Sequence, residues 1–88
     1  MIKNLKEKAT QALALPREIV LDLPVVTVTG RGEVYIENYK NLIEFNDTKI
    51  HIRTKDGTIA VTGADLTLNQ ITTENLRVVG QIGTVVLE

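Results

Sequence analysis

The sequence contains no cysteine, serine or tryptophan, and each absence removes a class of function. Without cysteine there is neither a disulfide framework nor a thiolate metal site, which excludes a disulfide-stapled secreted scaffold and fits a reducing compartment. Without cysteine and serine, the two commonest nucleophiles of covalent catalysis are missing. Aromatic residues make up only 3% of the chain, too few for the stacking surfaces that bind sugars or single-stranded nucleic acid.

Strong charge of one sign and long apolar runs are also missing. The chain of 88 residues has 10 basic and 11 acidic residues and a net charge of -1, so it has no strong field to attract nucleic acid or an anionic membrane. It lacks a signal-peptide pattern and any run of about 18 apolar residues that could cross a bilayer. We therefore expect a protein without a nucleic-acid partner that is soluble or at most peripheral to a membrane.

No group of residues matches a catalytic or metal site. His51 is the only histidine, and it occupies a position expected to face solvent on a strand. One histidine with scattered carboxylates fits none of the usual metal-ligand spacings. Glu33 and Glu44 are expected to pair with basic residues on neighbouring strands rather than form a catalytic dyad. The sequence thus predicts no enzyme, and no catalytic, cofactor-binding or metal-binding residue.

Four glycines are predicted to mark turns or bulges. The phrase apolar-x-Val-x-Gly occurs three times, ending at Gly30, Gly63 and Gly80, and Gly57 follows Asp56 in a hairpin signal. Between these points, alternating apolar and polar residues predict eight short strands at 25–29, 33–37, 42–45, 49–53, 58–62, 65–69, 75–79 and 84–87.

The predicted strands have one aliphatic face and one polar face. The aliphatic face comprises Val26, Val28, Val34, Ile36, Ile43, Phe45, Ile50, Ile52, Ile59, Val61, Leu66, Leu68, Leu76 and Val78. Since a flat sheet cannot bury such a face by itself, we predict an all-β antiparallel meander curled into a sandwich or roll, with a β-solenoid-like stack as the alternative.

The first 24 residues are predicted to form a separate unit. Apolar residues at helical spacing from Ile2 to about Leu15 predict a short amphipathic α-helix, which Pro16 ends. A connector between Pro16 and Pro24 follows. We therefore divide the chain into an N-terminal helix and connector, residues 1–24, and a β domain, residues 25–88.

Two places are candidates for contact with a partner. Val85, Val86 and Leu87 are consecutive apolar residues, which breaks the alternation and is typical of a strand that is buried on both faces or pairs with another molecule. Glu37 and Asn38 end a predicted strand, where they can form an Asx-type turn or contact a partner. Uncharged, threonine-rich strands also favour association between sheet edges, so we expect a homo-oligomer.

Most of the chain resembles the YabP/YqfC family of bacterial sporulation proteins, with the YqfC branch most similar. The resemblance rests on LPREIVLDLP at 15–24, the glycine of VTVTG, IENYKNLIEF at 36–45, DGTIAVTGADLTL at 56–68 and the terminal LRVVGQIGTVVLE. It implies a small β-rich protein in the mother-cell cytoplasm of a sporulating bacterium, or peripheral at the forespore membrane, with a membrane protein as partner. It transfers no catalytic residue.

These observations favour a non-enzymatic scaffolding or assembly factor of sporulation. Such a protein would act by self-association or by docking to a membrane partner. The alternative is a small regulatory module whose curled sheet encloses a hydrophobic ligand.

Overall fold

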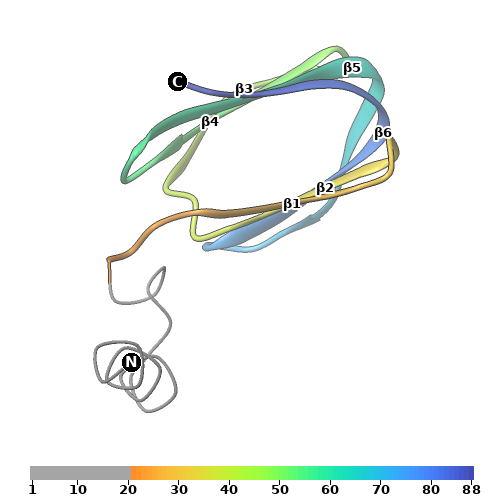
Figure 1. The fold of residues 1–88 in the computed structure, drawn as a ribbon. Helices are drawn as coiled ribbons and strands as arrows, with labels where there is room; N and C mark the ends of the chain where they lie inside the picture. The colour runs from red at the N-terminus through yellow and green to blue at the C-terminus, as the bar shows by residue number, and fades with distance from the viewer. Residues whose placement is uncertain (1–20) are drawn as a thin grey trace, which may run out of the picture.

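The structure is a computed structural model that describes residues 21–88. This part of the chain forms six strands and no helix: β1 (Val25–Thr29), β2 (Glu33–Glu37), β3 (Asn41–Phe45), β4 (Lys49–Thr54), β5 (Gly57–Ile71) and β6 (Asn75–Leu87). They make one antiparallel sheet in the order β1-β2-β6-β5-β4-β3 (Figure 1). The all-β prediction is confirmed, whereas the predicted N-terminal helix lies outside the described residues.

The prediction of eight strands is wrong, because two glycine-marked sites are bends within continuous strands. β5 covers both of the segments predicted at 58–62 and 65–69, and β6 covers those at 75–79 and 84–87. The register of the β5–β6 pair shifts next to Gly63, and a Cβ added there would overlap the carbonyl oxygen of Gln81. Gly80 has φ +149°, and a Cβ there would lie 2.5 Å from the carbonyl oxygen of Asp65. Glycine allows the two backbones to cross closely at the bend.

These bends fold the sheet over on itself into two layers (Figure 1). The first layer consists of β3, β4, residues 57–62 of β5 and residues 84–87 of β6. The second layer consists of β1, β2, residues 75–79 of β6 and residues 67–71 of β5. The result is a roll made from one open sheet rather than a solenoid-like stack.

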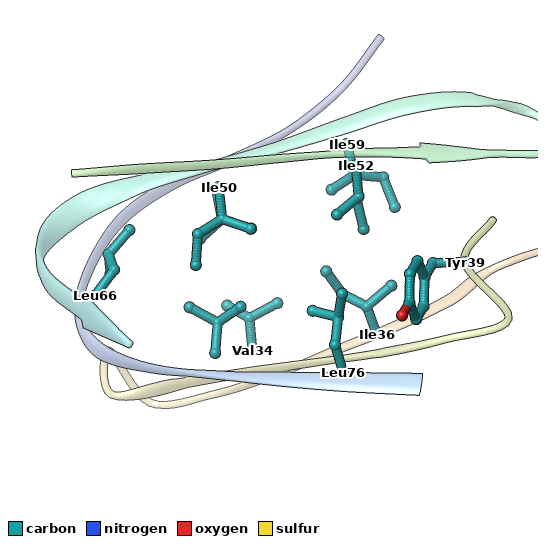
Figure 2. Packing of buried hydrophobic residues seen from close by; sticks show 10 residues of the cluster. Val34, Ile36, Tyr39, Ile50, Ile52, Ile59, Leu66 and Leu76 are labelled. Carbon is teal, nitrogen blue, oxygen red and sulfur yellow. The ribbon is translucent and has the colours of Figure 1, made fainter. Parts of the chain in front are cut away.

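The core lies between the layers and is almost entirely aliphatic (Figure 2). Nine side chains are at most 2% exposed: Val34, Ile36, Ile50, Ile52, Ile59, Val61, Leu66, Leu76 and Val78. All nine belong to the face predicted from alternation. Burying side chains of this size contributes about 1.5–3 kcal/mol each to folding. The alternation therefore identifies the interior correctly.

Three residues of the predicted aliphatic face are nevertheless exposed, because they lie on the outermost strands. Val28 in β1 is 50% exposed, and Ile43 and Phe45 in β3 are 45% and 49% exposed. A bulge between Leu42 and Glu44 leaves Ile43 without a partner in β4, so Leu42 rather than Ile43 lies opposite the core residue Ile52. A single extra residue thus reverses the faces of β3 at this point.

The predicted simple meander is broken at one point: consecutive strands pair from β1 to β2 and from β3 to β6, but β2 pairs with β6 instead of β3. Residues 38–40 carry the chain from the second layer to the first. The N–H groups of Asn38 and Tyr39 donate to the carbonyl of Glu74 at 2.6 and 3.0 Å, and that of Lys40 donates to Arg53 at 2.8 Å. This connection closes one end of the roll, where the Tyr39 ring packs against the core.

Candidate interaction edges

The open sheet leaves strand edges on two sides of the roll. β3 ends the first layer on one side, and residues 67–71 of β5 end the second layer on that side. On the other side the free edges are β1 and residues 84–87 of β6. Two surface hollows lie between these last two edges. Val26 of β1 and Leu87 of β6 line one hollow, and Val28 of β1 and Val85 of β6 line the other. β1 and the end of β6 therefore flank the same opening.

The two sides differ in how well their edges are protected from pairing with another chain. β3 has a bulge and carries Glu44, whose carboxylate lies 3.8 Å from Lys49 Nζ. Residues 67–71 of β5 are interrupted by a register shift between Leu68 and Gln70. Bulges and charges are the devices that keep natural edges from adding strands. β1 and residues 84–87 have neither a bulge nor a charged residue.

Val85, Val86 and Leu87, predicted to contact a partner, lie at the unprotected end of β6. Val85 and Leu87 are opposite the core residues Val61 and Ile59, so their side chains face the interior of the roll. Val86 is on the other face and is 43% exposed, while Leu87 is 72% exposed. This stretch therefore presents apolar side chains on both faces of one free edge.

Glu37 and Asn38, the other predicted contact, form a corner of the backbone. Asn38 has φ 70°, a conformation that asparagine tolerates better than most residues. Its side-chain Nδ2 donates to the carbonyl of Leu23 at 3.1 Å, and its backbone N–H lies 3.3 Å from Asn75 Oδ1. These bonds attach the chain before β1 to the β2–β3 connection. They are long-range bonds and not the local side-chain-to-backbone bond of an Asx-type turn, and contact with a partner stays a prediction.

One ion pair lies beside this corner. Lys40 Nζ is 2.6 Å from Asp22 Oδ2, and both side chains are about two-fifths exposed. The hydrogen bond from Lys40 holds the pKa of Asp22 below its ordinary value. Asp22 has φ 58°, so the pair fastens a left-handed residue at the start of the described chain.

His51 lies on the outer face of β4, but its side chain is only 23% exposed and its Nε2 is buried among polar side chains, so the prediction that it faces solvent holds only in part. Its Nε2 is 3.3 Å from Glu88 Oε1, which also accepts a hydrogen bond from Thr58 Oγ1 at 3.1 Å. Despite this short distance, His51 Nε2 has no hydrogen-bond partner among the described residues.

The predicted cross-strand pairing of carboxylates is found for Glu33 as well as for Glu44. Glu33 Oε2 accepts a hydrogen bond of 2.7 Å from Arg77 Nη1, and the Arg77 guanidinium lies over the Tyr35 ring, 4.8 Å from its centroid. Sequence reasoning did not identify Arg77 as the partner, because β2 and β6 are 38 or more residues apart in the chain.

Within residues 21–88, no three histidine, cysteine or carboxylate side chains come together as metal ligands. The same part of the chain has no helix long and apolar enough to cross a membrane. The four predicted structural glycines fall into two kinds, since Gly30 and Gly57 lie in or beside hairpin turns and Gly63 and Gly80 in bends.

Sequence reasoning missed β1 as a candidate edge. The signal was present in Val25 to Thr29, which contains no charged residue or proline, but the pattern of an edge strand and that of an interior strand are the same there. Only the strand order shows that β1 is outermost.

Comparison with known proteins agrees with the resemblance noted in the sequence. A family model described as the YabP family matches residues 23–88. The protein named "Uncharacterized protein YqfC" from Bacillus subtilis strain 168 is 31% identical over 82 residues, which cover 93% of this chain and 88% of the relative. No solved structure matches the chain. The family is associated with sporulation and is not a known family of enzymes.

Proposed function

The chain belongs to the YabP family, and on that basis we propose that it is a non-enzymatic structural or assembly factor of sporulation. It associates with itself, or docks a membrane protein of the sporulation programme, through the free edges of its sheet. It does so in the mother-cell cytoplasm or peripherally at the forespore membrane. The association of the family with sporulation supports the setting.

The observation that carries this proposal is the contrast between the two open sides of the roll. One side has edges protected by bulges and a charge, whereas β1 and residues 84–87 of β6 are regular and uncharged. These edges also carry exposed apolar side chains, among them Val28, Val86 and Leu87. Unprotected edges are templates for an added strand, and extended segments commonly bind proteins in this way.

The alternative function, a module that holds a hydrophobic ligand, is favoured by one feature. A hollow of about 480 Å³, open to solvent, lies between Pro24 and Val26 on one side and Ile59 and Leu87 on the other. Its size is within the range of ligand sites, which is roughly 300–1,000 Å³. However, the interior between the layers is filled by side chains, so a ligand would lie at the rim rather than inside the roll.

Sedimentation velocity of the purified full chain, from micromolar to millimolar concentration, tests self-association. We expect the mean mass to rise with concentration, and a strict monomer over the whole range would rule self-association out. Docking to a membrane protein is tested separately, by chemical cross-linking of a tagged chain in sporulating cells. We expect an adduct in the membrane fraction that a Val28→Lys, Val86→Lys double variant does not form.

The ligand alternative has its own readout. Native mass spectrometry of protein purified without detergent would show a co-purified small molecule, and its loss when Leu87 is replaced by aspartate would assign it to the hollow. A mass spectrum that contains only the mass of the polypeptide, without a bound molecule, would count against this alternative.

A further inference from the structure

We propose that residues 84–87 of β6 pair with the same residues of a second copy of the chain, across a two-fold axis that passes through Val86. This inference rests on the proposed self-association and specifies its surface and register. In that register Val85 lies opposite Leu87 of the second copy, and Val86 lies opposite itself.

The backbone hydrogen bonds of β6 set this register. The N–H and C=O groups of Glu88 both bond to Thr58 of β5, at 2.8 and 3.1 Å. In an antiparallel pair, residues that exchange hydrogen bonds alternate with residues whose polar groups point away. Thr84 and Val86 therefore also direct their polar groups toward β5, whereas Val85 and Leu87 direct theirs to the free edge. Pairing Val85 with Leu87 of the second copy satisfies all four groups of each chain's edge.

The side chains fit the same register. Val85 and Leu87 both face the interior of the roll, so a Val85–Leu87 pair continues the buried face from one copy into the other. Val86 breaks the alternation at the end of β6, since it is apolar on the outer face opposite Ala60. On the two-fold axis it contacts the Val86 of the second copy. The pairing thus accounts for three consecutive apolar residues at an exposed edge.

Neighbouring structure leaves this edge accessible within the described residues. Hydrogen bonds from Gly80 to Gly32 and from Ile82 to Arg31 end the contact between β6 and the β1–β2 hairpin. Beyond that point, residues 84–87 pair only with β5 in the described part of the chain. Charge does not oppose self-pairing, because residues 78–87 include no charged side chain.

The proposed contact involves only four residues of each chain, and this small size limits the expected affinity. A few residues on each strand bury less than the roughly 1,200 Å² typical of a stable specific interface. The second copy is therefore expected to bind weakly and reversibly, and a covalent trap is the appropriate test.

The absence of cysteine from the chain makes that trap specific. Across the axis, Val86 and its copy form a pair without mutual hydrogen bonds, whose Cα atoms are about 4.5 Å apart, a distance that a disulfide can bridge. The full-length Val86→Cys variant is oxidised with glutathione disulfide and the covalent dimer is followed over time. Ile43→Cys is the matched control, since Ile43 is 45% exposed against 43% for Val86 and lies on the protected edge of β3.

We expect Val86→Cys to form the covalent dimer several-fold faster than Ile43→Cys at the same concentration. Adding Val85→Pro should abolish the difference, because proline removes an N–H that points to the free edge and leaves the bonds to β5 intact. Circular dichroism melting of each variant confirms that the fold persists. Equal rates for the two cysteine variants would overturn the proposal, including the case in which residues 1–20 or another protein cover the edge.

Sedimentation of the wild-type chain separates a failure of this strand pairing from a failure of the proposed self-association. If the wild-type chain associates in sedimentation but the cysteine rates are equal, self-association stands and this edge is refuted. If the wild-type chain is a strict monomer and the rates are equal, both are refuted.

Discussion

Replacing Gly63 by alanine should destabilise the fold far more than the same change at Gly30 or Gly32. A Cβ at Gly63 would lie within 3.0 Å of the carbonyl oxygen of Gln81 and close to the backbone nitrogen of Gly83. Neither neighbour can rotate away, since both belong to the backbone of β6. The two strands would have to separate at the bend by more than an ångström. The nearby hydrogen bond from Gly63 N–H to the carbonyl of Thr48, 3.0 Å long, would be strained as well.

The size of the loss follows from these contacts. Forcing extra volume into a packed site costs about 1–3 kcal/mol, and each disrupted hydrogen bond adds about 1 kcal/mol. With the one hydrogen bond at Gly63, we therefore expect a loss of about 2–4 kcal/mol. A domain of this length has a total stability of about 4–13 kcal/mol, so Gly63→Ala should remove a large part of it.

Two further glycines calibrate the measurement. Gly30 has φ +54° and open space around it, so Gly30→Ala meets only the backbone penalty of about 1–2 kcal/mol. Gly32 has an ordinary φ and its nearest neighbour is 4.0 Å from an added Cβ, so Gly32→Ala should leave stability within about 1 kcal/mol of the wild type.

Urea unfolding followed by circular dichroism measures all three variants. The expected order of stability is Gly32→Ala, Gly30→Ala and then Gly63→Ala, with the last partly unfolded without denaturant if the wild type is at the lower end of the range. If Gly63→Ala were as stable as Gly30→Ala, the close crossing of β5 and β6 at this bend would be refuted.

Two other predictions follow from the edge and from the ion pair. Val86→Lys and Val86→Glu should each weaken self-association by about 1–3 kcal/mol, because like charges would face each other about 6 Å apart across the axis. Mixing the two variants should restore a one-to-one heterodimer in sedimentation. Failure of the mixture to associate would contradict a two-fold axis at this residue. Asp22→Asn should lower the melting temperature at pH 7, because the lowered pKa of Asp22 stabilises the fold above the ordinary aspartate pKa. This contribution is lost as the pH falls below about 4, so the difference in melting temperature between wild type and variant should close at pH 2–3. A difference independent of pH would show that the Lys40 pair is not its cause.

The sequence predicts the interior of this protein better than its connections. Alternation identifies the buried residues from Val34 to Val78 because the side-chain period of a strand is a local property. The bulge at Ile43 escapes detection, since one inserted residue changes the faces without altering the composition. Nothing near either strand in the sequence indicates that Val34 pairs with Val78, so the β2–β6 contact requires the structure.

The glycine phrases show the same limit. Gly30 ends a hairpin strand and Gly63 bends a continuous one, yet both follow the letters Val-Thr. The difference comes from what lies beside each residue, which is open space at Gly30 and the backbone of β6 at Gly63. Of the candidate contacts, the apolar run at Val85 to Leu87 could be found from sequence, whereas β1 required the strand order.

The passage of β5 and β6 through both layers has a consequence for how the protein comes apart. Each layer contains half of both strands, so neither layer is an independent unit that could open while the other stays intact. Slow amide hydrogen exchange should therefore reach the same ceiling in β4 as in residues 75–79 of β6, set by global unfolding. β3 is attached to this frame through β4 alone and is exposed along its whole length, so its amides should exchange first.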